Sequence, residues 1–493
     1  MAECIYLYID SANYSEAAML FSGREKEKEV LEKCMKSTES EMIAIIGRRR
    51  VGKTRLVRES FKGMIDFEMT GIYEATLSEQ LENFKSKLSE YGGKPVDVTP
   101  KSWFEAFSLL KDFLSGKRVK RKKVIFFDEL PWIASARSKF LQNFSHFWND
   151  WAEKNGMVII ICGSAASWMV TNVVHHKGGL HNRITRFIQL KPFTLSETSA
   201  YFKKQKISLT QYQITQLYMI MGGVPHYLKE VERGQSVSQI IDKLCFSDYG
   251  LLKDEYSKLL ASLYKQSDIH DAILRSLGKR WQGLTRQDIV KISGLNDGGS
   301  INRALKELEE SSFISQYQPF GKKKKGTLFR LTDYYILFYL KFMEGKKISG
   351  EGAFSQLYSK PTWSSWSGYA FENLCLNHSG QIKQALGIPS VYTVSSSFIA
   401  KGDKQKNGAQ IDMLLDRDDG VINICEAKFY DGRFTITKEY AAKLRNKRIV
   451  LKEHTGTLKN LSLVIISPFG LNQNEYSLDL IDNSITLEDL FKG

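Results

Sequence analysis

Cysteine is scarce in this sequence, and no two cysteines stand close together. The six in the 493-residue chain lie far apart and mostly among apolar residues: Cys4, Cys34, Cys162, Cys245, Cys375 and Cys425. Zinc sites and disulfide frameworks usually show clustered cysteines, often as C-x-x-C pairs. We therefore expect reduced thiols in the core of a cytosolic protein, and neither a zinc centre nor a disulfide-stapled secreted fold.

Long hydrophobic runs are missing as well. No uninterrupted apolar stretch reaches the roughly 18 residues that a membrane-spanning helix needs. Residues 1–6 lack the basic region and the long apolar region of a secretory signal. Hydrophobic residues make up 42% of the chain and charged residues 25%. We expect a globular protein of the cytoplasm with no membrane partner.

Acidic residues are outnumbered by basic ones. The chain has 70 Lys and Arg against 55 Asp and Glu, a formal net charge of +15. This excess favours a polyanionic partner such as nucleic acid. Two basic runs concentrate the charge, at residues 117–123 and 322–325. Either run alone is more often a solvated surface than a binding site.

One eight-residue motif predicts a nucleotide site. Residues 47–54 read Gly-Arg-Arg-Arg-Val-Gly-Lys-Thr, between an apolar run at 42–46 and a helix-like segment at 54–61. In a G-x-x-x-x-G-K-[ST] loop, glycines let backbone N–H groups surround the β-phosphate, the lysine reaches the β- and γ-phosphates, and the Thr hydroxyl binds Mg²⁺. These roles fall on Gly47, Gly52, Lys53 and Thr54. The other positions expected to line the nucleotide are Arg48, Arg49, Arg50, Val51 and Arg55.

A second element predicts hydrolysis of that nucleotide. Residues 124–127 are apolar and are followed by Asp128 and Glu129, as in a buried parallel strand that ends in a Walker B pair. Asp128 is expected to hold the Mg²⁺ shell, and Glu129 to orient or deprotonate the attacking water. The alternative is a buried strand followed by a solvated acidic turn.

Three further positions are candidates near the phosphates or the base. A buried strand at 157–162 ends before Ser164, which is expected near the γ-phosphate. Arg183 is a candidate arginine finger for a neighbouring subunit, although an ordinary surface arginine is equally common. Pro225, in the turn Gly-Gly-Val-Pro at 222–225, is a candidate to pack on the adenine ring.

Five motifs in order carry a resemblance to a known family. They are Phe-x-Gly-Arg-Glu at 21–25, the phosphate loop, Asp-Glu-Leu-Pro-Trp at 128–132, Gly-Ser at 163–164 and Gly-Gly-Val-Pro at 222–225. Residues 20–240 or so resemble the archaeal-type P-loop ATPases, a family in the STAND branch of AAA-like ATPases. The resemblance implies ATP as the nucleotide, Arg24 and Pro225 near its base and sugar, and Ser164 at the sensor 1 position. The spacing of arginines around Arg183 varies within the family.

The middle of the chain has the pattern of a winged helix. Three amphipathic helices are expected, then two strands joined by a wing that carries Lys322–Lys325; the segments are 269–277, 285–292, 301–311, 313–317 and 327–331. On a DNA reader the third helix enters the major groove with Asn302, Arg303 and Lys306, and the wing lysines neutralise phosphates. The alternative is an intramolecular lid over the nucleotide, as in many STAND proteins.

The C-terminal part has a second group of acids. Strands are expected at 409–415 and 421–428, joined by a polar hairpin. Asp412 and Glu426 can then face one pocket suited to Mg²⁺, and Lys428 shares the face of Glu426 because side chains alternate along a strand. Glu372, on a helix at 366–375, is expected to complete the metal site.

Residues 360–470 resemble the core of the PD-(D/E)xK nucleases. Glu426-Ala427-Lys428 matches the E-x-K triplet, while Ile411 stands where the family has proline. This region also resembles a C-terminal domain of unknown function that is often attached to the ATPase family. A catalytically silent fold of this type, or a plain salt-bridged hairpin, is the alternative.

The expected fold is α/β, with an AAA-like parallel sheet, a helical lid, a winged helix and a restriction-endonuclease-like domain. The expected parts are an extension without structure at 1–18, with Met19 as an alternative start, an ATPase core at 19–190, a lid at 191–262, a winged helix at 263–340 and a nuclease-like domain at 355–493. The predicted function is ATP hydrolysis coupled to DNA binding and Mg²⁺-dependent cleavage of nucleic acid. The rival is a nucleotide-dependent switch that binds DNA or a protein and cuts nothing. A mechanical ATPase acting as a homo-oligomer is the third possibility.

Overall fold

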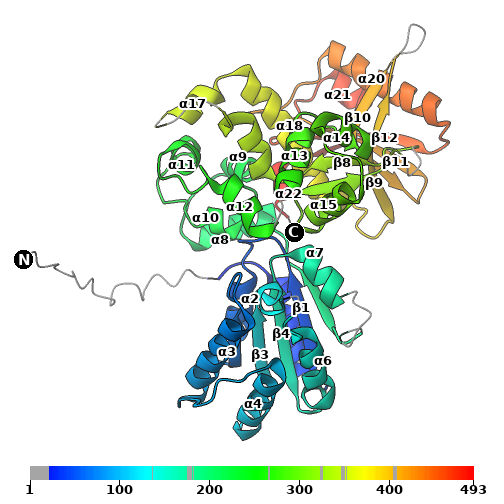
Figure 1. Ribbon diagram of the computed structural model, residues 1–493. Helices are drawn as coiled ribbons and strands as arrows, with labels where there is room; N and C mark the ends of the chain where they lie inside the picture. Colours follow the sequence, from blue (N-terminus) through cyan, green and yellow to red (C-terminus); the bar gives the residue numbers. More distant parts are fainter. Residues whose placement is uncertain are drawn as a thin grey trace, which may run out of the picture.

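The computed structural model describes residues 21–492, apart from positions 136, 175–179, 181, 265–266, 322–325, 346–349, 351 and 403–407. The predicted extension at 1–18, Met19, Cys4 and the wing lysines 322–325 lie outside the described residues. Figure 1 shows two groups of elements, a parallel sheet with its helices below and a larger assembly of helices and two further sheets above.

Five parallel strands form the sheet of the lower group, in the order β2-β3-β4-β1-β5. Their bounds are β1 (Glu41–Ile46), β2 (Ile65–Thr70), β3 (Lys123–Asp128), β4 (Met157–Gly163) and β5 (Arg186–Gln189). Strands β1 and β4 are buried at every position, which explains why they read as unbroken apolar runs. Because the strands are parallel, the segments that follow β1, β3 and β4 meet at one edge of the sheet.

Helices cover both faces of this sheet (Figure 1). They are α1 (Glu25–Lys36), α2 (Lys53–Ser60), α3 (Leu77–Gly92), α4 (Trp103–Gly116), α5 (Leu130–Ile133), α6 (Phe140–Asp150) and α7 (Ala166–Met169). One face packs on α1 and α2 through Leu31 and Leu56. The other packs on α3, α4 and α6 through an aromatic core that includes Phe107, Phe140 and Phe144. The aromatic spacing of the segment at 140–151 is therefore a core pattern, as predicted.

A group of helices follows the sheet and takes the place of the predicted lid. It consists of α8 (Leu195–Lys204), α9 (Gln211–Met221), α10 (Pro225–Leu228), α11 (Val237–Ile241) and α12 (Glu255–Leu263). The turn before α10 packs tightly on the start of α8, because the Phe193 amide donates to the Gly223 carbonyl at 2.7 Å. A Cβ atom at Gly223 would lie 1.9 Å from the Phe193 carbonyl oxygen, so only glycine fits this crossing.

A three-helix, three-strand unit follows, here called the middle unit (residues 267–333). It contains α13 (Ser267–Gly278), β6 (Leu284–Thr285), α14 (Arg286–Ser293), α15 (Gly299–Glu310), β7 (Ile314–Tyr317) and β8 (Leu328–Leu331). The strands form an antiparallel sheet in the order β6-β8-β7. The three helices and two long strands agree with the predicted segments to within about two residues, a normal margin for element ends.

The C-terminal part is built on a second five-stranded sheet, in the order β13-β12-β11-β10-β9. Its elements, after α16 (Tyr334–Phe338) and α17 (Ala353–Tyr358), are α18 (Pro361–Asn377), α19 (Ser379–Ala385), β9 (Thr393–Ala400), β10 (Ala409–Arg417), β11 (Val421–Ala427), α20 (Lys438–Thr455), β12 (Asn460–Ile466), α21 (Glu475–Leu480), β13 (Asn483–Ile485) and α22 (Leu487–Leu490). Strands β9, β10 and β11 are antiparallel neighbours, and β12 and β13 add in parallel. The predicted hairpin joins β10 to β11.

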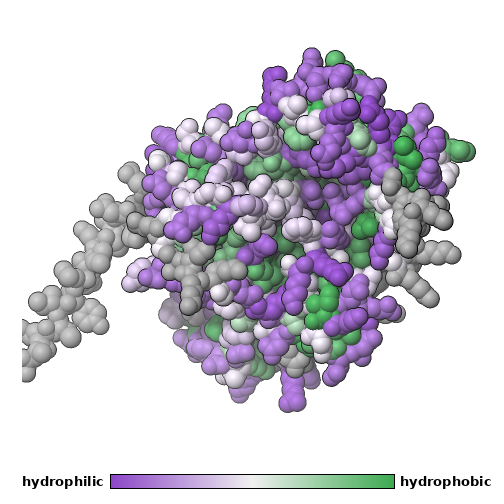
Figure 2. Space-filling model, turned by 90° about the horizontal axis from the view of Figure 1, so that it is seen from above, coloured by the Kyte–Doolittle hydropathy of each residue, from purple (hydrophilic) through white to green (hydrophobic). Residues whose placement is uncertain are grey.

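One hydrophobic core runs through the lid helices, the middle unit, α18 and part of the C-terminal sheet. The lid, the middle unit and the C-terminal part therefore have different topologies but share one hydrophobic core. The five described cysteines are buried and free. Viewed from above, the surface is mainly hydrophilic, with apolar residues in small patches (Figure 2). Within the described residues, no helix combines the length and apolar character needed to cross a membrane.

Candidate functional site

The phosphate loop between β1 and α2 closes around its own lysine. The Lys53 ammonium donates to the carbonyl oxygens of Gly47, at 2.9 Å, and Arg48, at 3.2 Å. Gly47 and Gly52 have positive φ, and a Cβ at Gly47 would lie 2.4 Å from the Leu190 carbonyl oxygen. The Lys53 side chain is buried, and this burial lowers its pKa, while the nearby Glu129 carboxylate acts in the opposite direction.

The acids after β3 lie against the start of α2. The Thr54 hydroxyl donates to an Asp128 carboxylate oxygen at 2.6 Å, and Asp128 is 4% exposed. Burial raises the pKa of Asp128, and the hydrogen bond from Thr54 opposes this rise. A hydroxyl and a carboxylate at this separation are the hard oxygen ligands that Mg²⁺ prefers, so these two residues fit the predicted metal.

Glu129 is held by Ser164 across the end of the sheet. One Glu129 carboxylate oxygen accepts hydrogen bonds from the Ser164 amide, at 3.0 Å, and from the Ser164 hydroxyl, at 2.8 Å. Glu129 has a left-handed backbone with φ of 49°, an unusual conformation for a residue with a side chain. The structure therefore brings together Thr54, Asp128, Glu129 and Ser164, the four residues that sequence motifs predicted at this edge.

The motif at 21–25 reaches the same loop. The Arg24 guanidinium donates to the Val51 carbonyl at 3.3 Å and lies 4.5 Å from the centre of the Phe193 ring. Its backbone amide donates to Glu197 at 3.1 Å. Burial lowers the pKa of Arg24, and Glu197 opposes this effect. Arg24 thus joins the phosphate loop to α8, while Pro225 begins α10 in the adjoining lid.

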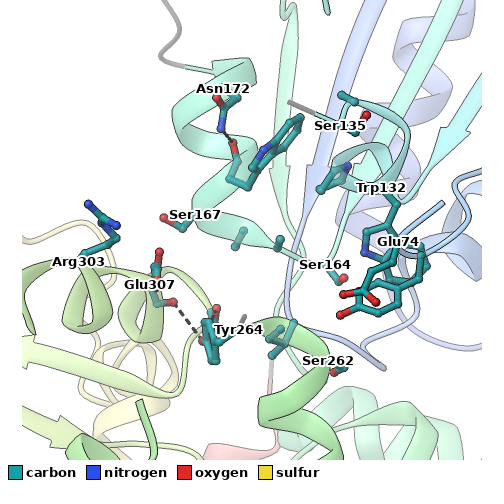
Figure 3. Close-up of a pocket in the computed structure, with 18 of the residues that line it drawn as sticks. Glu74, Trp132, Ser135, Ser164, Ser167, Asn172, Ser262, Tyr264, Arg303 and Glu307 are labelled. Atoms are coloured by element: carbon teal, nitrogen blue, oxygen red, sulfur yellow. Dashed lines mark hydrogen bonds between the residues drawn. The ribbon is translucent and has the colours of Figure 1, made fainter. Parts of the chain in front are cut away.

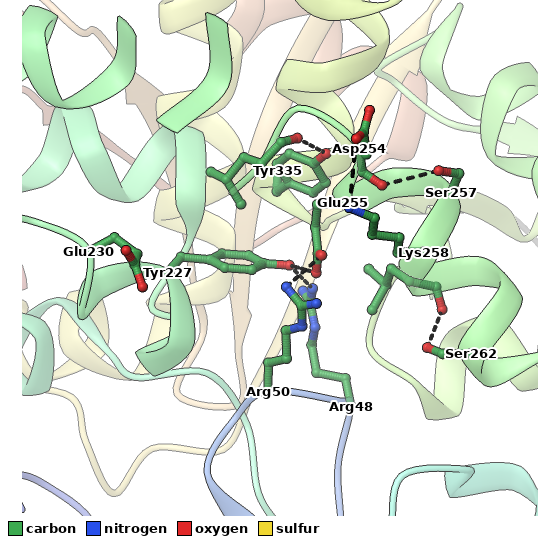
Figure 4. Close-up of polar contacts among 12 residues, drawn as sticks. Arg48, Arg50, Tyr227, Glu230, Asp254, Glu255, Ser257, Lys258, Ser262 and Tyr335 are labelled. Carbon is green, nitrogen blue, oxygen red and sulfur yellow. Dashed lines mark hydrogen bonds and ion pairs between the residues drawn. The ribbon is translucent and has the colours of Figure 1, made fainter. Parts of the chain in front are cut away.

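Two arginines of the loop point away from it, toward the lid and the middle unit (Figure 4). Arg50 forms an ion pair with Glu255 of α12 at 2.5 Å, and Glu255 is fully buried. The Tyr227 hydroxyl donates to the same carboxylate at 2.7 Å. Arg48, 3% exposed, pairs with Asp333 at the end of the middle unit and lies 5.0 Å from the centre of the Phe313 ring.

Arg48 and Arg50 are predicted to line the nucleotide, and in this structure their side chains pair with Asp333 and Glu255; their role at the nucleotide stays a prediction. The Arg48 carbonyl accepts from the Lys53 ammonium at 3.2 Å, so the backbone of Arg48 remains part of the phosphate loop. Of the other two arginines named from the motif, Arg49 is half-buried beside Lys53, and the Arg55 guanidinium lies 6.0 Å from the centre of the Phe21 ring.

Arg183 lies at the opposite edge of the sheet from the phosphate loop. It precedes β5, whose entry is fixed by the hydrogen bond from the Thr185 amide to the Met42 carbonyl. The Arg183 guanidinium pairs with Glu153 at 3.0 Å. A role at the γ-phosphate therefore requires the site of another subunit, and it stays a prediction.

A second cluster of acids lies on the C-terminal sheet. We call Glu372 of α18, Asp412 of β10 and Glu426 of β11 the carboxylate cluster. Burial raises the pKa of Glu372 to about 8, and the charge of Asp412 adds to this rise. Lys428 lies beside the cluster, with its ammonium 3.7 Å from a Glu426 oxygen. The four residues are therefore electrostatic neighbours, as predicted.

The Glu426 carboxylate is hydrogen-bonded by two residues that the sequence motifs did not indicate. It accepts from the Lys447 ammonium at 2.5 Å and from the Tyr440 hydroxyl at 3.1 Å, and Glu426 is 2% exposed. Tyr440 and Lys447 stand two turns apart on α20, a spacing that places them on one face of the helix. Within the described ranges, no three His, Cys, Asp or Glu side chains lie close enough to hold a metal ion. The three-carboxylate metal site is thus not assembled in this conformation.

The middle unit lies over the carboxylate cluster. Trp281 stacks on Tyr369 with ring centres 5.0 Å apart, and Gln282 donates to Gln410 at 3.4 Å. Together with Tyr317 and Arg330 they close a small pocket whose floor includes Glu372 and Asp412. Next to it, the Phe320 amide donates to the Ser397 carbonyl on β9 at 2.7 Å.

The comparison with known families identifies the domain in the first part of the chain. Residues 21–231 match a family described as an ATPase domain predominantly from Archaea. This segment is an archaeal-type P-loop ATPase domain. The resemblance seen in the five motifs is thereby confirmed for the ATPase domain, which is a nucleotide-binding domain.

Similar proteins cover more of the chain at lower identity. An uncharacterized protein of Methanocaldococcus jannaschii is 24% identical over 426 residues, which are 84% of this chain and 88% of that one. Among solved structures, a Walker-type ATPase of Pyrococcus abyssi has 16% identity and a TM-score of 0.48, covering 65% of this chain and 96% of its own. The ORC2 protein of Aeropyrum pernix, in complexes with ADPNP and ADP, has 12% identity and a TM-score of 0.42, covering 64% and 91%.

A cavity of about 1000 Å³ separates the ATPase domain from α15 of the middle unit. Figure 3 shows Ser164, Ser167 and Trp132 on the side of the ATPase domain, and Arg303 and Glu307 on the other side. Helix α15 thus turns part of its polar face toward the ATPase domain.

The residues predicted to read DNA are arranged differently from the expectation. Arg303 faces this cavity, and the Asn302 side chain accepts a hydrogen bond from Arg286 at 2.6 Å. All three residues are exposed, and Lys306 has an intrahelical partner, Glu310, at 3.7 Å.

Proposed function

We propose that the chain hydrolyses ATP at the phosphate loop with Mg²⁺. The observation that carries this proposal is the meeting of Thr54, Asp128, Glu129 and Ser164 at the end of the sheet, with Thr54 and Asp128 2.6 Å apart. Lys53 holds the β- and γ-phosphates in this account, and the backbone N–H groups of the loop surround the β-phosphate. Mg²⁺ bound through Thr54 and Asp128 would neutralise charge on the β- and γ-phosphates.

Glu129 acts on the attacking water. The water oxygen forms a new bond to the γ-phosphorus, the bond to the ADP oxygen breaks, and Glu129 orients the water and accepts its proton. Ser164 positions Glu129 through the hydrogen bonds at 2.8 and 3.0 Å. Because an error of about 1 Å in the position of a reacting group can cost roughly a hundredfold in rate, this contact is important for turnover.

Substitution of Ser164 tests the proposal. Ser164→Ala removes the hydroxyl donor to Glu129, and we expect kcat for ATP hydrolysis to fall by roughly ten- to a hundredfold with little change in ATP affinity. Phosphate release and nucleotide binding are measured in the presence of Mg²⁺. Ser167→Ala is the matched control, since Ser167 lines the same cavity and should leave turnover unchanged. Equal turnover in the parent and Ser164→Ala would remove Ser164 from the mechanism, and a parent that releases no phosphate would contradict the ATPase itself.

We also propose that the middle unit is a winged helix and that residues 355–493 form a PD-(D/E)xK nuclease-like domain. The order α13-β6-α14-α15-β7-β8 supports the first assignment. The second is supported by α18 followed by the β9-β10-β11 meander, α20 and the parallel strand β12. The carboxylate cluster lies where β10 and β11 are neighbours, with Lys428 beside it.

The proposed output is cleavage of DNA. Once Lys447 and Tyr440 release Glu426, Asp412 and Glu426 could hold a divalent cation, which would polarise the scissile phosphate. A water oxygen then forms a bond to phosphorus and loses a proton to solvent, while one phosphodiester P–O bond breaks and the leaving oxygen takes a proton from solvent. Lys428 orients the water or stabilises the charge that develops. The net charge of +15 favours attraction to the nucleic-acid backbone.

The rival function has an observation of its own. Both oxygens of Glu426 are engaged, by Lys447 and Tyr440, which suits a nuclease-like fold that binds without cutting. In that account ATP controls a regulatory switch, and binding of DNA weakens steeply with salt while no strand is cleaved. Assembly into a homo-oligomer with Arg183 as a finger in trans is a further proposal.

A further inference from the structure

The middle unit contacts both chemical sites of the chain. At one end, Asp333 pairs with Arg48 of the phosphate loop. At the other, Trp281, Gln282 and Tyr317 close the pocket over the carboxylate cluster. Its buried residues, such as Ile273, Ile301 and Leu308, belong to one core, so the two ends are connected through packed side chains. Displacement at one end is therefore expected to be felt at the other.

The end at the phosphate loop is a double ion pair, here called the latch: Arg48 with Asp333, and Arg50 with Glu255. All four residues are buried except Arg50, whose side chain is 24% exposed. The Asp333 carboxylate also accepts from the Ile336 amide at 2.9 Å, which caps α16. Two carboxylates from the lid and the middle unit thus hold two guanidinium groups of the segment that cradles phosphate.

A bound triphosphate competes with the latch. Guanidinium groups bind phosphate oxygens and carboxylate oxygens with similar geometry, and often through paired hydrogen bonds. Arg48 and Arg50 lie five and three residues before Lys53, so ATP brings negative charge beside both. A ligand shifts a conformational equilibrium only if it binds one state better. In the unlatched state Arg48 and Arg50 are free to bind phosphate, so this state binds ATP more tightly.

The end at the carboxylate cluster is a cover. The Trp281 ring stacks on Tyr369 of α18, whose hydroxyl donates back to the Trp281 carbonyl at 3.1 Å. Ser397 of β9 is 7% exposed, and the Phe320 amide donates to its carbonyl. A phosphodiester strand cannot reach Glu372 and Asp412 while these contacts persist.

We propose that ATP binding opens the latch and lifts the middle unit from the carboxylate cluster. Without nucleotide, Glu255 and Asp333 keep the unit in place and the cluster closed. The regulatory role rests on the proposed function of the C-terminal domain, whereas the movement itself does not require that the domain cuts DNA.

Ser397→Cys reports the movement by thiol labelling. This substitution is small, and the residue is covered by the middle unit. The five described native cysteines are buried, and the parent protein gives the background rate. We expect slow reaction with a small thiol reagent such as DTNB in the nucleotide-free protein. A non-hydrolysable ATP analogue with Mg²⁺ should raise the rate by roughly tenfold, a coupling of ordinary size between two sites.

Variants of the latch give the decisive comparison. In the Ser397→Cys background, Glu255→Gln or Asp333→Asn should label fast without nucleotide. Lys53→Ala should label slowly with or without the analogue. Glu344→Gln is the matched control, because Glu344 pairs with Arg275 of the middle unit and makes no contact with the phosphate loop among the described residues; it should behave as the parent.

Two results would overturn the proposal. The first is one labelling rate with and without the analogue, in a protein that binds it. The second is slow labelling in the folded latch variants. Should the carboxylate substitutions prevent folding, Arg50→Gln breaks the same pair from its partly exposed side. If labelling responds to nucleotide but the protein cleaves no DNA, the proposed movement stands and the proposed nuclease activity is rejected. The failure of one proposal can therefore be told from the failure of the other.

Discussion

Lys53→Ala is expected to weaken ATP binding by about a hundredfold, or ~3 kcal/mol, and to abolish hydrolysis. The Lys53 ammonium lies inside the loop, 2.9 Å from the Gly47 carbonyl, and its charge faces the place of the β- and γ-phosphates. Alanine leaves the cradle intact but removes the ammonium that the motif places inside it. Titration with a fluorescent ATP analogue and phosphate release measure the two effects.

The fold should survive this change. Burial lowers the pKa of Lys53, whereas its ammonium also donates to the carbonyls of Gly47 and Arg48. Because the relief of the buried charge and the loss of these hydrogen bonds oppose each other, the melting temperature of Lys53→Ala should stay close to that of the parent. Lys62→Ala, at an exposed lysine just beyond α2, is the control that should bind ATP normally. Equal ATP affinity in Lys53→Ala and the parent would refute the assigned role.

Lys428→Ala is expected to lower DNA cleavage by roughly a thousandfold while DNA binding persists. The Lys428 ammonium lies 3.7 Å from Glu426 and 5.2 Å from the centre of the Tyr440 ring, at the edge of the carboxylate cluster. Its ammonium is suited to orient a water or to stabilise negative charge at phosphorus. Plasmid, linear, single-stranded and branched DNA are tested with Mg²⁺ or Mn²⁺, with and without ATP.

The control for this experiment is Lys443→Ala. Lys443 is an exposed lysine of α20 that pairs with Glu439, and its loss removes the same charge without touching the cluster. Cleavage that continues in Lys428→Ala would place the activity elsewhere or in a contaminant. Salt-dependent DNA binding by the parent with no cleavage of any substrate would favour the regulatory switch.

The ATPase site was predictable because its information is local. The residues predicted at the phosphates follow buried apolar strands, and parallel strands deliver their carboxyl ends to one edge of the sheet. The positions of Thr54, Asp128 and Glu129 follow from this rule. Ser164 follows β4, the strand next to β3. Because the register between β3 and β4 is regular, Ser164 lies beside Glu129.

The latch was not predictable, because its partners are remote in sequence. Arg48 and Asp333 are 285 residues apart, and nothing in the motif distinguishes an arginine that binds phosphate from one that binds a distant carboxylate. The same holds for Trp281 over Tyr369, 88 residues apart. Such contacts depend on how whole units pack, which periodicity and motif spacing do not encode.

The carboxylate cluster falls between these cases. Alternation along two strands correctly predicted β10, β11 and their hairpin, and it placed Asp412 near Glu426. The predicted metal site was incomplete, because Tyr440 and Lys447 reach Glu426 from α20 after the crossover from β11. Their spacing along one helix face was visible in the sequence, but the direction of that face depends on tertiary packing.

The central claim is that this chain hydrolyses ATP with Glu129 acting on the water, and Glu129→Gln tests it most directly. Glutamine keeps the size of the side chain and its hydrogen bonding to Ser164 but removes the carboxylate that accepts a proton. ATP binding and single-turnover hydrolysis are measured on the same protein. The account predicts unchanged ATP affinity with hydrolysis slowed by roughly a hundredfold or more. Hydrolysis by Glu129→Gln at the rate of the parent would contradict it.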